Sequence, residues 1–570
     1  MIEDRRPIDG LSHVKGATDS PLLRLTIPAL LRETATRFPD RDAAIFLAQN
    51  IRWSYAELSR EVDRLAGGLL HLDIVKGDRV DIWSPNRIEW LLTQFATARI
   101  GAILVCINPA YRLRELDYAL NKAGCKALVT AKSFKTSDYA GMLQELAPEL
   151  STAAPGDLRT AKFPALRSVI VMGDDASPGA IAFDDVCAAG GDVPAVELDA
   201  ITDGLSPDDP INIQFTSGTT GSPKGACLTH FNIVNNAHFV TAAMEFTEAD
   251  RLCIPVPFYH CFGMVMGTLG CVGKGAAIVI AAEGFDPAET LKTVSAEKCT
   301  ALYGVPTMFV AELALDNFES YDLSHLRTGI MAGAPCPIEI MKQVQSRMNM
   351  TDVTIAYGMT ETSPVSFQSN VDDPLDKRVG SVGRVHPHVE VKVIGEDGHS
   401  VPIGVQGELL TRGYSVMRKY WDDPEKTAES IDGDGWMHTG DLANIDGEGY
   451  CDITGRVKDM ICRGGENIYP REIEEFLFTH PDIIQAQVFG VPDPKYGEIV
   501  CAWIVLRGGA DIGADDIKVF CKRNIAHFKM PAHVRFKDEL PMTVTGKPQK
   551  FIMRDQMMAT LDLPASGQDP

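Results

Sequence analysis

The chain has 570 residues, more than one hydrophobic core normally serves, and this length predicts two or more domains. Hydrophobic residues make up 45% and charged residues 23%, as in ordinary globular proteins. The formal net charge of −23 at pH 7 argues against nucleic acid or an anionic membrane as partner, so an anionic substrate would need local basic groups.

The N-terminal stretch MIEDRRPIDG is polar and is followed by no apolar signal region. No apolar run further along approaches the length of a membrane span. The 13 cysteines are dispersed without a C-x-x-C pair, which favours a reducing compartment over a disulfide framework or a zinc site. We expect a cytoplasmic protein without a membrane span.

The first third of the chain alternates helix and strand patterns. Residues 54–70 predict a helix, because Ser54 and Glu57 form a capping box and the apolar residues recur on one face. Further helices are expected at 87–101 and 112–124, and strands at 79–83, 102–107 and 126–131. Such an alternation predicts a parallel sheet with helices on both faces. Residues ~145–165 and ~175–210 have the composition of surface excursions.

A polar loop at residues 216–225, TSGTTGSPKG, has the composition of a phosphate-binding loop. Glycines let backbone N–H groups converge on an anion, although an ordinary polar turn has a similar composition. A Walker-type loop is excluded, because Pro223 stands where its second glycine belongs and Gly225 where its Mg²⁺-binding hydroxyl belongs.

The secondary structure that the sequence predicts changes twice in the second half of the chain. From about Val379 to residue 455, short strands and turns predict a β-rich part. A new unit begins between Gly455 and Asp459, with a helix around 469–481 whose first turn suits Pro470. We therefore expect a large N-terminal domain at 1–456, including the β-rich part at about 379–455, and a small C-terminal domain at 457–570.

Seven further unusual stretches follow the polar loop in a fixed order. They are PFYHCFG (257–263), GAP (333–335), YGMTE (357–361), TGD (439–441), GRVKD (455–459), RGGENIYPREIE (463–474) and PMTVTGK (541–547). Together with TSGTTGSPKG they resemble the motifs of AMP-forming acyl-CoA synthetases, within the adenylate-forming superfamily of luciferases and peptide-synthetase adenylation domains. Residues 92–112 and 463–477 look most similar to medium-chain fatty-acyl-CoA ligases.

The resemblance implies a fold and a reaction. The fold is α/β, with parallel α/β sheets and a β-rich subdomain in the large domain and a small mobile α+β domain that swings about a hinge at Lys458. The reaction uses ATP, Mg²⁺ and coenzyme A: a carboxylate attacks the α-phosphorus of ATP to give acyl-adenylate and pyrophosphate, and the CoA thiol then displaces AMP.

The resemblance also implies the catalytic residues. Lys547 would supply positive charge during adenylation, although a lysine in a turn is usually a solvated surface residue. Glu361 would bind Mg²⁺ and Thr360 would contact the α-phosphate. His260 would position the acid, beside an apolar acyl tunnel that includes residues 303–309; taken alone, a histidine among aromatic residues is more often a packed core residue.

Binding residues follow by the same resemblance. The phosphate loop would use Thr216, Ser217, Gly218, Thr219, Thr220 and Lys224. The adenine pocket would use Gly333, Ala334, Pro335, Tyr357 and Gly358, and the ribose would contact Asp441 and Arg456. Gly464 and Gly465 would line the pantetheine channel, because absent side chains let a narrow thiol arm pass. Contacts to the CoA nucleotide stay open among Arg463, Arg471 and Lys529.

Several alternatives stay open at this point. The acid could be a medium-chain fatty acid or an aryl, cyclic or sulfur-containing short acid, and the acceptor could be a separate acyl carrier protein or oxygen instead of CoA. A catalytically silent nucleotide-binding homologue is a third interpretation. The P-x-x-x-x-G-K spacing around Lys547 fits recognition by a protein acetyltransferase, which would remove the charge of that lysine. Homodimers are common among relatives of this family.

Overall fold

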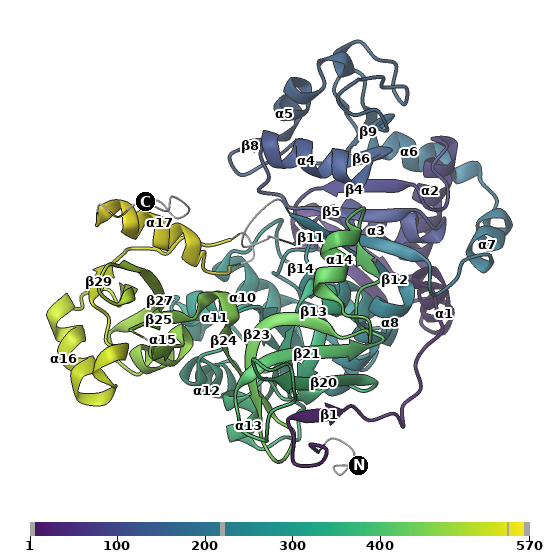
Figure 1. The fold of residues 1–570 in the computed structure, drawn as a ribbon. Coiled ribbons are helices and arrows are strands. Elements are labelled where there is room, and N and C mark those ends of the chain that lie inside the picture. The colour runs from purple at the N-terminus through teal and green to yellow at the C-terminus, as the bar shows by residue number, and fades with distance from the viewer. Residues whose placement is uncertain (1–5, 217–222, 465, 544–545, 562, 564–570) are drawn as a thin grey trace.

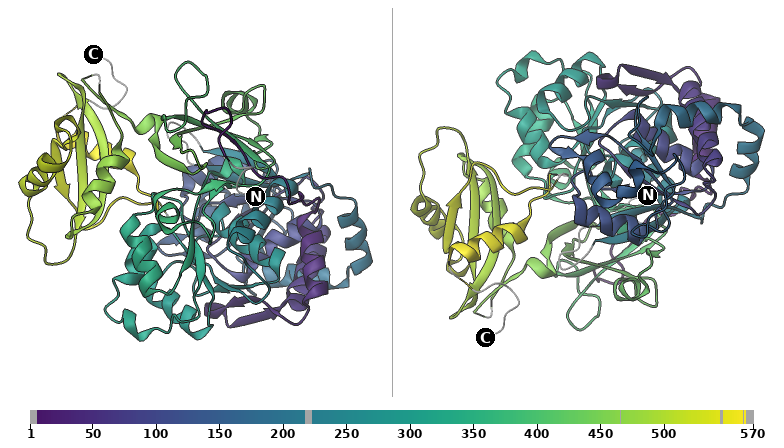
Figure 2. Two further views of the ribbon diagram at one scale, coloured as in Figure 1. Left: turned by 90° about the horizontal axis from the view of Figure 1, so that it is seen from below. Right: turned by 90° about the horizontal axis from the view of Figure 1, so that it is seen from above.

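The computed structural model describes residues 6–216, 223–464, 466–543, 546–561 and 563. Its three large sheets form one body, and the C-terminal elements stand beside it as a smaller lobe (yellow in Figures 1 and 2). This mixed α/β architecture confirms the predicted fold class. The domain boundary at 456/457 stays a prediction.

The first large sheet has the order β10-β9-β6-β4-β5-β11-β12-β22. Its centre is parallel, from β9 through β6, β4 and β5 to β11. Strand β12 then pairs antiparallel with β11, and β22 pairs antiparallel with β12. The three strands predicted in the first third of the chain therefore pair as expected. The strands are β4 (Arg79–Trp83), β5 (Ile103–Ile107), β6 (Ala127–Thr130), β9 (Ser168–Val171), β10 (Ile181–Ala182), β11 (Pro210–Thr216), β12 (Lys224–Thr229) and β22 (Lys419–Tyr420).

The second large sheet has the order β19-β18-β17-β16-β15-β13-β14-β2-β3 and is parallel from β17 to β2. Its strands are β2 (Asp42–Phe46), β3 (Ile51–Ser54), β13 (Arg251–Cys253), β14 (Ala277–Ile280), β15 (Ala301–Gly304), β16 (Thr328–Ala332), β17 (Asp352–Gly358), β18 (Val365–Gln368) and β19 (Arg384–Val385).

A third, antiparallel sheet is the β-rich part expected after Val379. Its order is β1-β20-β21-β23-β24, so the N-terminal strand β1 adds to its edge, which the sequence patterns did not predict. Its strands are β1 (His13–Lys15), β20 (Val389–Ile394), β21 (Gly407–Gly413), β23 (Met437–Ile445) and β24 (Cys451–Arg456); a separate small hairpin pairs β7 (Ser133–Phe134) with β8 (Ser137–Asp138).

The smaller lobe is a five-stranded sheet, with the path β26-β25-β28-β27 and β29 pairing with β28. Helix α15 begins at Pro470, as the sequence predicted, and it buries Ile473 and Leu477 against this sheet. The lobe comprises β25 (Ile461–Arg463), β26 (Glu466–Ile468), α15 (Pro470–Phe478), β27 (Ile483–Asp493), β28 (Gly497–Leu506), α16 (Ala514–Asn524), β29 (His533–Phe536) and α17 (Lys550–Thr560).

The helices of the large body follow the predicted pattern in the first third. The capping box of α2 is present: the Glu57 N–H donates to Ser54 Oγ and the Ser54 N–H to the Glu57 carboxylate. These helices are α1 (Ile27–Arg37), α2 (Tyr55–His71), α3 (Ile88–Arg99), α4 (Leu113–Ala123), α5 (Tyr139–Leu146), α6 (Phe183–Ala189), α7 (Ala195–Asp203), α8 (His230–Ala243), α9 (Gly270–Lys274), α10 (Pro287–Ala296), α11 (Pro306–Leu313), α12 (Ile338–Arg347), α13 (Leu375–Gly380) and α14 (Pro424–Ser430).

One predicted surface excursion is more regular than expected. Residues 175–210 contain α6 and α7, and α6 packs against α2 with Phe183 buried. Composition did not reveal these helices because both are short, seven and nine residues, and stand in a stretch rich in Gly, Asp and Ala. None of the helices in the described part of the chain combines the length and apolar character that crossing a bilayer requires.

Candidate active site

The predicted site residues meet where strands of the first and the second sheet end. Thr216 ends β11, Gly333 follows β16, and Tyr357 and Gly358 end β17. Carboxyl ends of parallel strands are the usual place for ligand sites in α/β folds. The third sheet and the C-terminal segment then contribute Asp441, Arg456 and Lys547.

The expected phosphate end is a chain of polar contacts around a buried carboxylate. Lys224 Nζ donates to the Tyr420 hydroxyl at 2.9 Å, and that hydroxyl donates to Glu361 Oε1 at 2.8 Å. The Thr216 hydroxyl lies 3.2 Å from the same Glu361 oxygen, and Thr216 is the cross-strand partner of Lys224. The structure thus joins Lys224 to Glu361 through Tyr420 and Thr216 to Glu361 directly. Ser217, Gly218, Thr219 and Thr220 lie outside the described residues.

Glu361 sits in a single 3₁₀ turn, Thr360–Thr362, directly after β17. It is 4% exposed and Thr360 is 7% exposed, and the Glu361 carbonyl accepts a hydrogen bond from the Met417 N–H. Among the described residues, no group of three or more His, Cys, Asp or Glu could hold a metal. A single carboxylate beside the Thr216 hydroxyl nevertheless fits Mg²⁺, which prefers few protein oxygens together with water and substrate phosphates.

The expected ribose end is built on Asp441. Asp441 in β23 is the cross-strand partner of Arg456 in β24, and Arg456 Nε donates to Asp441 Oδ1 at 3.1 Å. The Tyr357 hydroxyl donates to Asp441 Oδ2 at 2.6 Å. Burial, together with the charge of Asp441, raises the pKa of Tyr357 well above its usual value, so the phenol stays a donor. Asp441 is thereby fixed in one orientation.

Two glycines of the expected adenine pocket could not be replaced without strain, one because of space and one because of its backbone conformation. A Cβ on Gly358 would lie 1.8 Å from the Pro364 carbonyl oxygen. Gly333 has φ +87°, a conformation that favours glycine, and a Cβ there would lie 3.7 Å from Lys547 Cε. Ala334 follows it half-buried and Pro335 follows exposed. The segment expected to line the adenine pocket therefore lies directly beside the lysine.

Lys547 reaches this place from a turn that it helps to close. The Thr543 N–H donates to the Lys547 carbonyl at 2.8 Å, and the Lys547 N–H donates back to Thr543 Oγ1 at 2.9 Å. Gly546 has φ +75°, and a Cβ there would lie 2.8 Å from Val305 Cγ2. Burial, and then repulsion from the Arg456 cation, lower the pKa of Lys547. The turn thus packs on the large body and presents a desolvated amine.

His260 stands at the start of a buried π-helix, Phe262–Leu269. Its Nδ1 lies 3.2 Å from the Phe262 N–H and accepts from it, which leaves the imidazole proton on Nε2. Burial, and then the charge of Lys547, lower the pKa of His260 to about 3. The side chain is therefore a neutral hydrogen-bonding group at ordinary pH.

Asn86 holds the loop that carries His260. Its Nδ2 donates to the Val256 carbonyl at 3.0 Å, and its Oδ1 accepts from the Phe258 N–H at 2.8 Å. The Asn86 N–H donates to the Glu283 carbonyl at 3.1 Å, which ties the same loop to the segment after β14. Sequence patterns gave no signal for Asn86, because its partners lie about 170 to 200 residues away.

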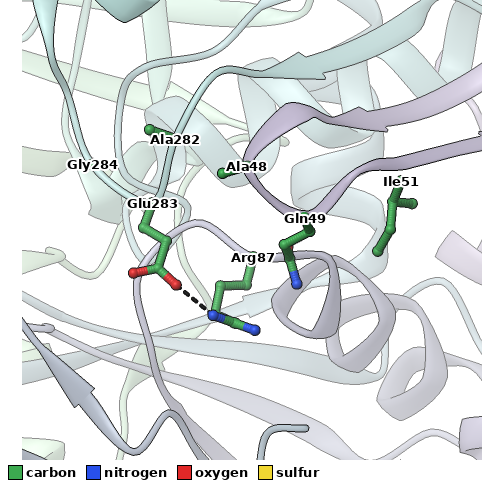
Figure 3. A pocket seen from close by; sticks show the side chains of 7 residues that line it. All are labelled: Ala48, Gln49, Ile51, Arg87, Ala282, Glu283 and Gly284. Atoms are coloured by element: carbon green, nitrogen blue, oxygen red, sulfur yellow. Dashed lines mark hydrogen bonds and ion pairs between the residues drawn. The ribbon is translucent and has the colours of Figure 1, made fainter.

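A hollow of about 740 Å³ lies on the surface next to the hydrogen bonds of Asn86. Its lining residues are Ala48, Gln49, Ile51, Arg87, Ala282, Glu283 and Gly284 (Figure 3). The Arg87 guanidinium pairs with Glu283 and, at 3.0 Å, with Glu89, and the Gln49 amide donates to Glu89. These polar groups satisfy one another, and none of the predicted site residues lines the hollow. It is not the candidate active site.

The residues expected to act in the second half of the reaction lie in the smaller lobe and at its start. Lys458 is exposed in the 3₁₀ turn Val457–Asp459. Gly464 has φ +62°, and its N–H donates to the Tyr496 carbonyl at 2.7 Å. Gly465 lies outside the described residues.

The three candidates for CoA-nucleotide contacts are engaged within the chain. Arg463 donates to the Phe528 carbonyl at 2.9 Å, Arg471 pairs with Glu475 at 2.8 Å, and Lys529 pairs with Glu472 at 2.5 Å. The geometry therefore singles out none of the three.

Comparison with protein families decides the identity. The model of the AMP-binding enzymes matches residues 31–421, and the model of the AMP-binding enzyme C-terminal domain matches residues 472–547. The chain belongs to the AMP-binding enzyme family. The expected resemblance is confirmed: this AMP-binding enzyme is an AMP-forming acyl-CoA synthetase, an acid–thiol ligase.

Named relatives cover nearly the whole chain. "Putative acyl-CoA synthetase YngI" of Bacillus subtilis is 49% identical over 547 residues, which is 96% of this chain and 99% of that protein. "Medium-chain acyl-CoA ligase ACSF2, mitochondrial" of Mus musculus is 46% identical over 563 residues, 98% of this chain and 91% of that protein.

Solved structures agree. The anthranilate CoA ligase AuaEII in complex with anthranoyl-AMP superposes with a TM-score of 0.84 at 25% identity, over 96% of this chain and 99% of that one. ATP-bound MatB from Rhodopseudomonas palustris superposes with a TM-score of 0.80 at 30% identity, over 94% of this chain and 100% of that one. ATP and CoA as substrates of this AMP-binding enzyme fit these relatives.

Proposed function

We propose that this acyl-CoA synthetase activates a medium-chain fatty acid with ATP and Mg²⁺ and transfers the acyl group to CoA through an acyl-adenylate. One observation carries the proposal. Lys547, in the C-terminal segment, lies close enough to Glu361, Asp441 and Arg456 for their charges to act on its pKa. Its own charge in turn lowers the pKa of His260.

Adenylation brings a carboxylate against a phosphate, so positive charge must be present where negative charge accumulates. The Lys547 ammonium supplies it at the α-phosphate, next to Thr360. Glu361 and Thr216 would hold Mg²⁺, and the ion would supply positive charge against the phosphate oxygens. Lys224, at the start of β12, binds the outer phosphates, together with the loop that precedes it.

The remaining contacts hold the nucleotide and the acid. Asp441, with both oxygens already oriented, accepts hydrogen bonds from the ribose hydroxyls, and Arg456 lies beside the same sugar. The segment from Gly333 to Pro335 and Tyr357 with Gly358 border the adenine. Neutral His260 donates from Nε2 toward the acid's carboxylate, which orients the nucleophile without taking a proton.

Buried aromatic side chains in the stretches 257–263 and 303–309 support a medium-chain acid. Phe262 and Tyr303 are buried with their rings 5.3 Å apart, and Phe258 is fully buried. An apolar lining with few polar groups suits an alkyl chain. The name of the murine relative, a medium-chain acyl-CoA ligase, supports the same class.

Thioester formation needs a second arrangement of the same site. The C-terminal unit 457–570 turns about Lys458, withdraws Lys547, and brings Gly464 and Gly465 to the pantetheine path. We also propose a homodimer. We further propose regulation by acetylation of Lys547, because removal of that charge would stop the first half-reaction and spare the second.

The test is pyrophosphate release across a panel of acids, with ATP and Mg²⁺, in the presence and absence of CoA. The panel spans acetate to palmitate and adds benzoate, cyclohexanecarboxylate and sulfur-containing short acids. Multiple turnovers only with CoA and a maximum at about C6 to C12 are expected from the burial of ~0.8 kcal/mol per methylene in an apolar tunnel of limited depth. A single burst that CoA cannot prolong would contradict the proposal and point to an acyl carrier protein.

Replacing His260 with alanine is expected to raise the KM for the acid about tenfold, the value of roughly one hydrogen bond of 1.4 kcal/mol. Because the pKa of His260 is about 3, the imidazole is neutral from pH 5 to 8, so the shape of the pH profile in that range stays unchanged. Initial rates against acid concentration and pH measure both effects.

His238 provides the matched control. It is another half-buried histidine, on α8, whose pKa burial lowers to about 4, and it is not a site residue. His238→Ala should leave the KM for the acid unchanged. Loss of an acidic limb near pH 6 in His260→Ala would instead show that His260 acts as a general base.

A further inference from the structure

Tyr420 stands between two charged groups of the phosphate end. Its hydroxyl oxygen accepts from Lys224 Nζ at 2.9 Å, and its hydroxyl hydrogen points to Glu361 Oε1 at 2.8 Å. The residue is 1% exposed. One phenol therefore links the cation to the carboxylate.

The ring and the backbone of Tyr420 are both fixed. The Lys224 ammonium lies 4.3 Å from the centroid of the Tyr420 ring, so the ring face also attracts the cation. Tyr420 pairs with Ala226 across β22 and β12, the strand that begins at Lys224. Its N–H donates to Thr427 Oγ1 at 3.0 Å in α14. The phenol therefore has little freedom to turn away from either partner.

A phenol is suited to this place because it accepts and donates through one atom. A phenol has an ordinary pKa of about 10, so at neutral pH the hydroxyl keeps the proton that it donates. Direct pairing of Lys224 with Glu361 would bring the two groups together and would use the charge of each. The intervening hydroxyl keeps them one phenol oxygen apart, with both charges available to a ligand.

We propose that Tyr420 is a positioning residue that sets Lys224 and Glu361 at a fixed separation for the metal-bound triphosphate of ATP. The inference rests on the proposed function, because it uses the roles assigned there to Lys224 and Glu361. It adds a residue from the edge strand of the first sheet, with no part in binding the acid or CoA. Loss of its hydroxyl should therefore weaken nucleotide binding selectively.

The experiment compares wild type with Tyr420→Phe, which keeps the ring and removes the hydroxyl. Calorimetric titration with the non-hydrolysable α,β-methylene analogue of ATP and Mg²⁺ should give a Kd about 10-fold higher in the variant. This is the lower end of what a hydrogen bond to a charged group contributes. Titration with Mn²⁺ in the presence of the analogue, read by electron paramagnetic resonance, should show weaker metal binding. The KM values for the acid and for CoA should not change.

Tyr450 offers a matched control. Its hydroxyl accepts from Arg384 at 2.7 Å and donates to Asp373 at 2.7 Å, and Arg384 lies 4.1 Å from its ring centroid. Tyr450→Phe therefore removes a phenol from an equivalent cation–hydroxyl–carboxylate arrangement that contains no site residue. Tyr450→Phe should lower the Tm about as much as Tyr420→Phe does, and it should leave the Kd for the nucleotide analogue unchanged.

The outcomes separate the possibilities. Equal affinity for the analogue in wild type and Tyr420→Phe would overturn the positioning role alone. A rise in the KM values of ATP, acid and CoA together, with a lower Tm, would overturn it in favour of a structural role. Wild-type protein that bound no analogue in the presence of Mg²⁺ would overturn the proposed function and this role together.

Discussion

Replacing Lys547 with alanine should slow formation of the acyl-adenylate by about 100- to 1000-fold, the usual loss when one preorganised stabiliser of transition-state charge is removed. Conversion of supplied acyl-adenylate and CoA to acyl-CoA should proceed at nearly the wild-type rate. The reason is geometric: Lys547 is held beside Gly333 by a turn of the C-terminal segment, and the second half-reaction is proposed to use a different face of that segment. Single-turnover rates of the two half-reactions, measured separately, test this division.

The pH dependence of adenylation should carry the signature of the same lysine. Burial lowers the pKa of Lys547 below the ordinary lysine value of 10.5, so this ammonium loses its proton at a lower pH than an exposed lysine does. The charge that assists adenylation is present below the lowered pKa and is lost as the pH rises through it. The profile of kcat/KM for ATP, which reports the free enzyme, should therefore have an alkaline limb below 10.5 that Lys547→Ala lacks.

Lys537 supplies the control for this prediction. It belongs to the same lobe, with its ammonium 4.2 Å from the centroid of the Trp503 ring, and it is not a site residue. Lys537→Ala should leave both half-reactions unchanged. Equal losses in the two half-reactions of Lys547→Ala would refute the proposed division of labour.

Local chemistry explains what could be predicted from the sequence. The capping box at Ser54 and Glu57 and the first-turn proline of α15 depend on neighbours within a few residues, and both occur as expected. The motif order pointed to Glu361, Asp441, Arg456 and Lys547, because each lies in a short stretch of unusual composition. The structure brings these four together from three parts of the chain.

Contacts between distant segments explain what could not be predicted. Tyr420 becomes part of the site only because β22 pairs with β12, and the dipeptide that forms β22 has no pattern of its own. Asn86 acts on a loop about 170 residues away. Strand β1 joins β20, nearly 380 residues along the chain. Periodicity reports which face of an element is buried, but it does not report which element covers that face.

Asp441→Asn is the second prediction with a large effect. The substitution keeps the shape of the side chain, removes its charge and turns one acceptor into a donor that faces Tyr357 or Arg456, both of which are donors themselves. Each hydrogen bond to a charged group is worth about 1.5–3 kcal/mol, so the loss of one toward a ribose hydroxyl should weaken ATP binding about 10- to 100-fold. Calorimetric titration with ATP analogues measures this loss.

The pattern across the two half-reactions distinguishes Asp441 from Lys547. The ribose belongs to ATP in the first half-reaction and to the acyl-adenylate in the second, so Asp441→Asn should impair both, whereas Lys547→Ala should impair only the first. Asp446→Asn is the control, since Asp446 pairs with Lys377 at 2.5 Å in the turn after β23 and is not a site residue. An Asp441→Asn variant that binds ATP as tightly as wild type would remove Asp441 from the nucleotide site. The pair of variants therefore separates residues that hold the nucleotide from the one that assists attack on it.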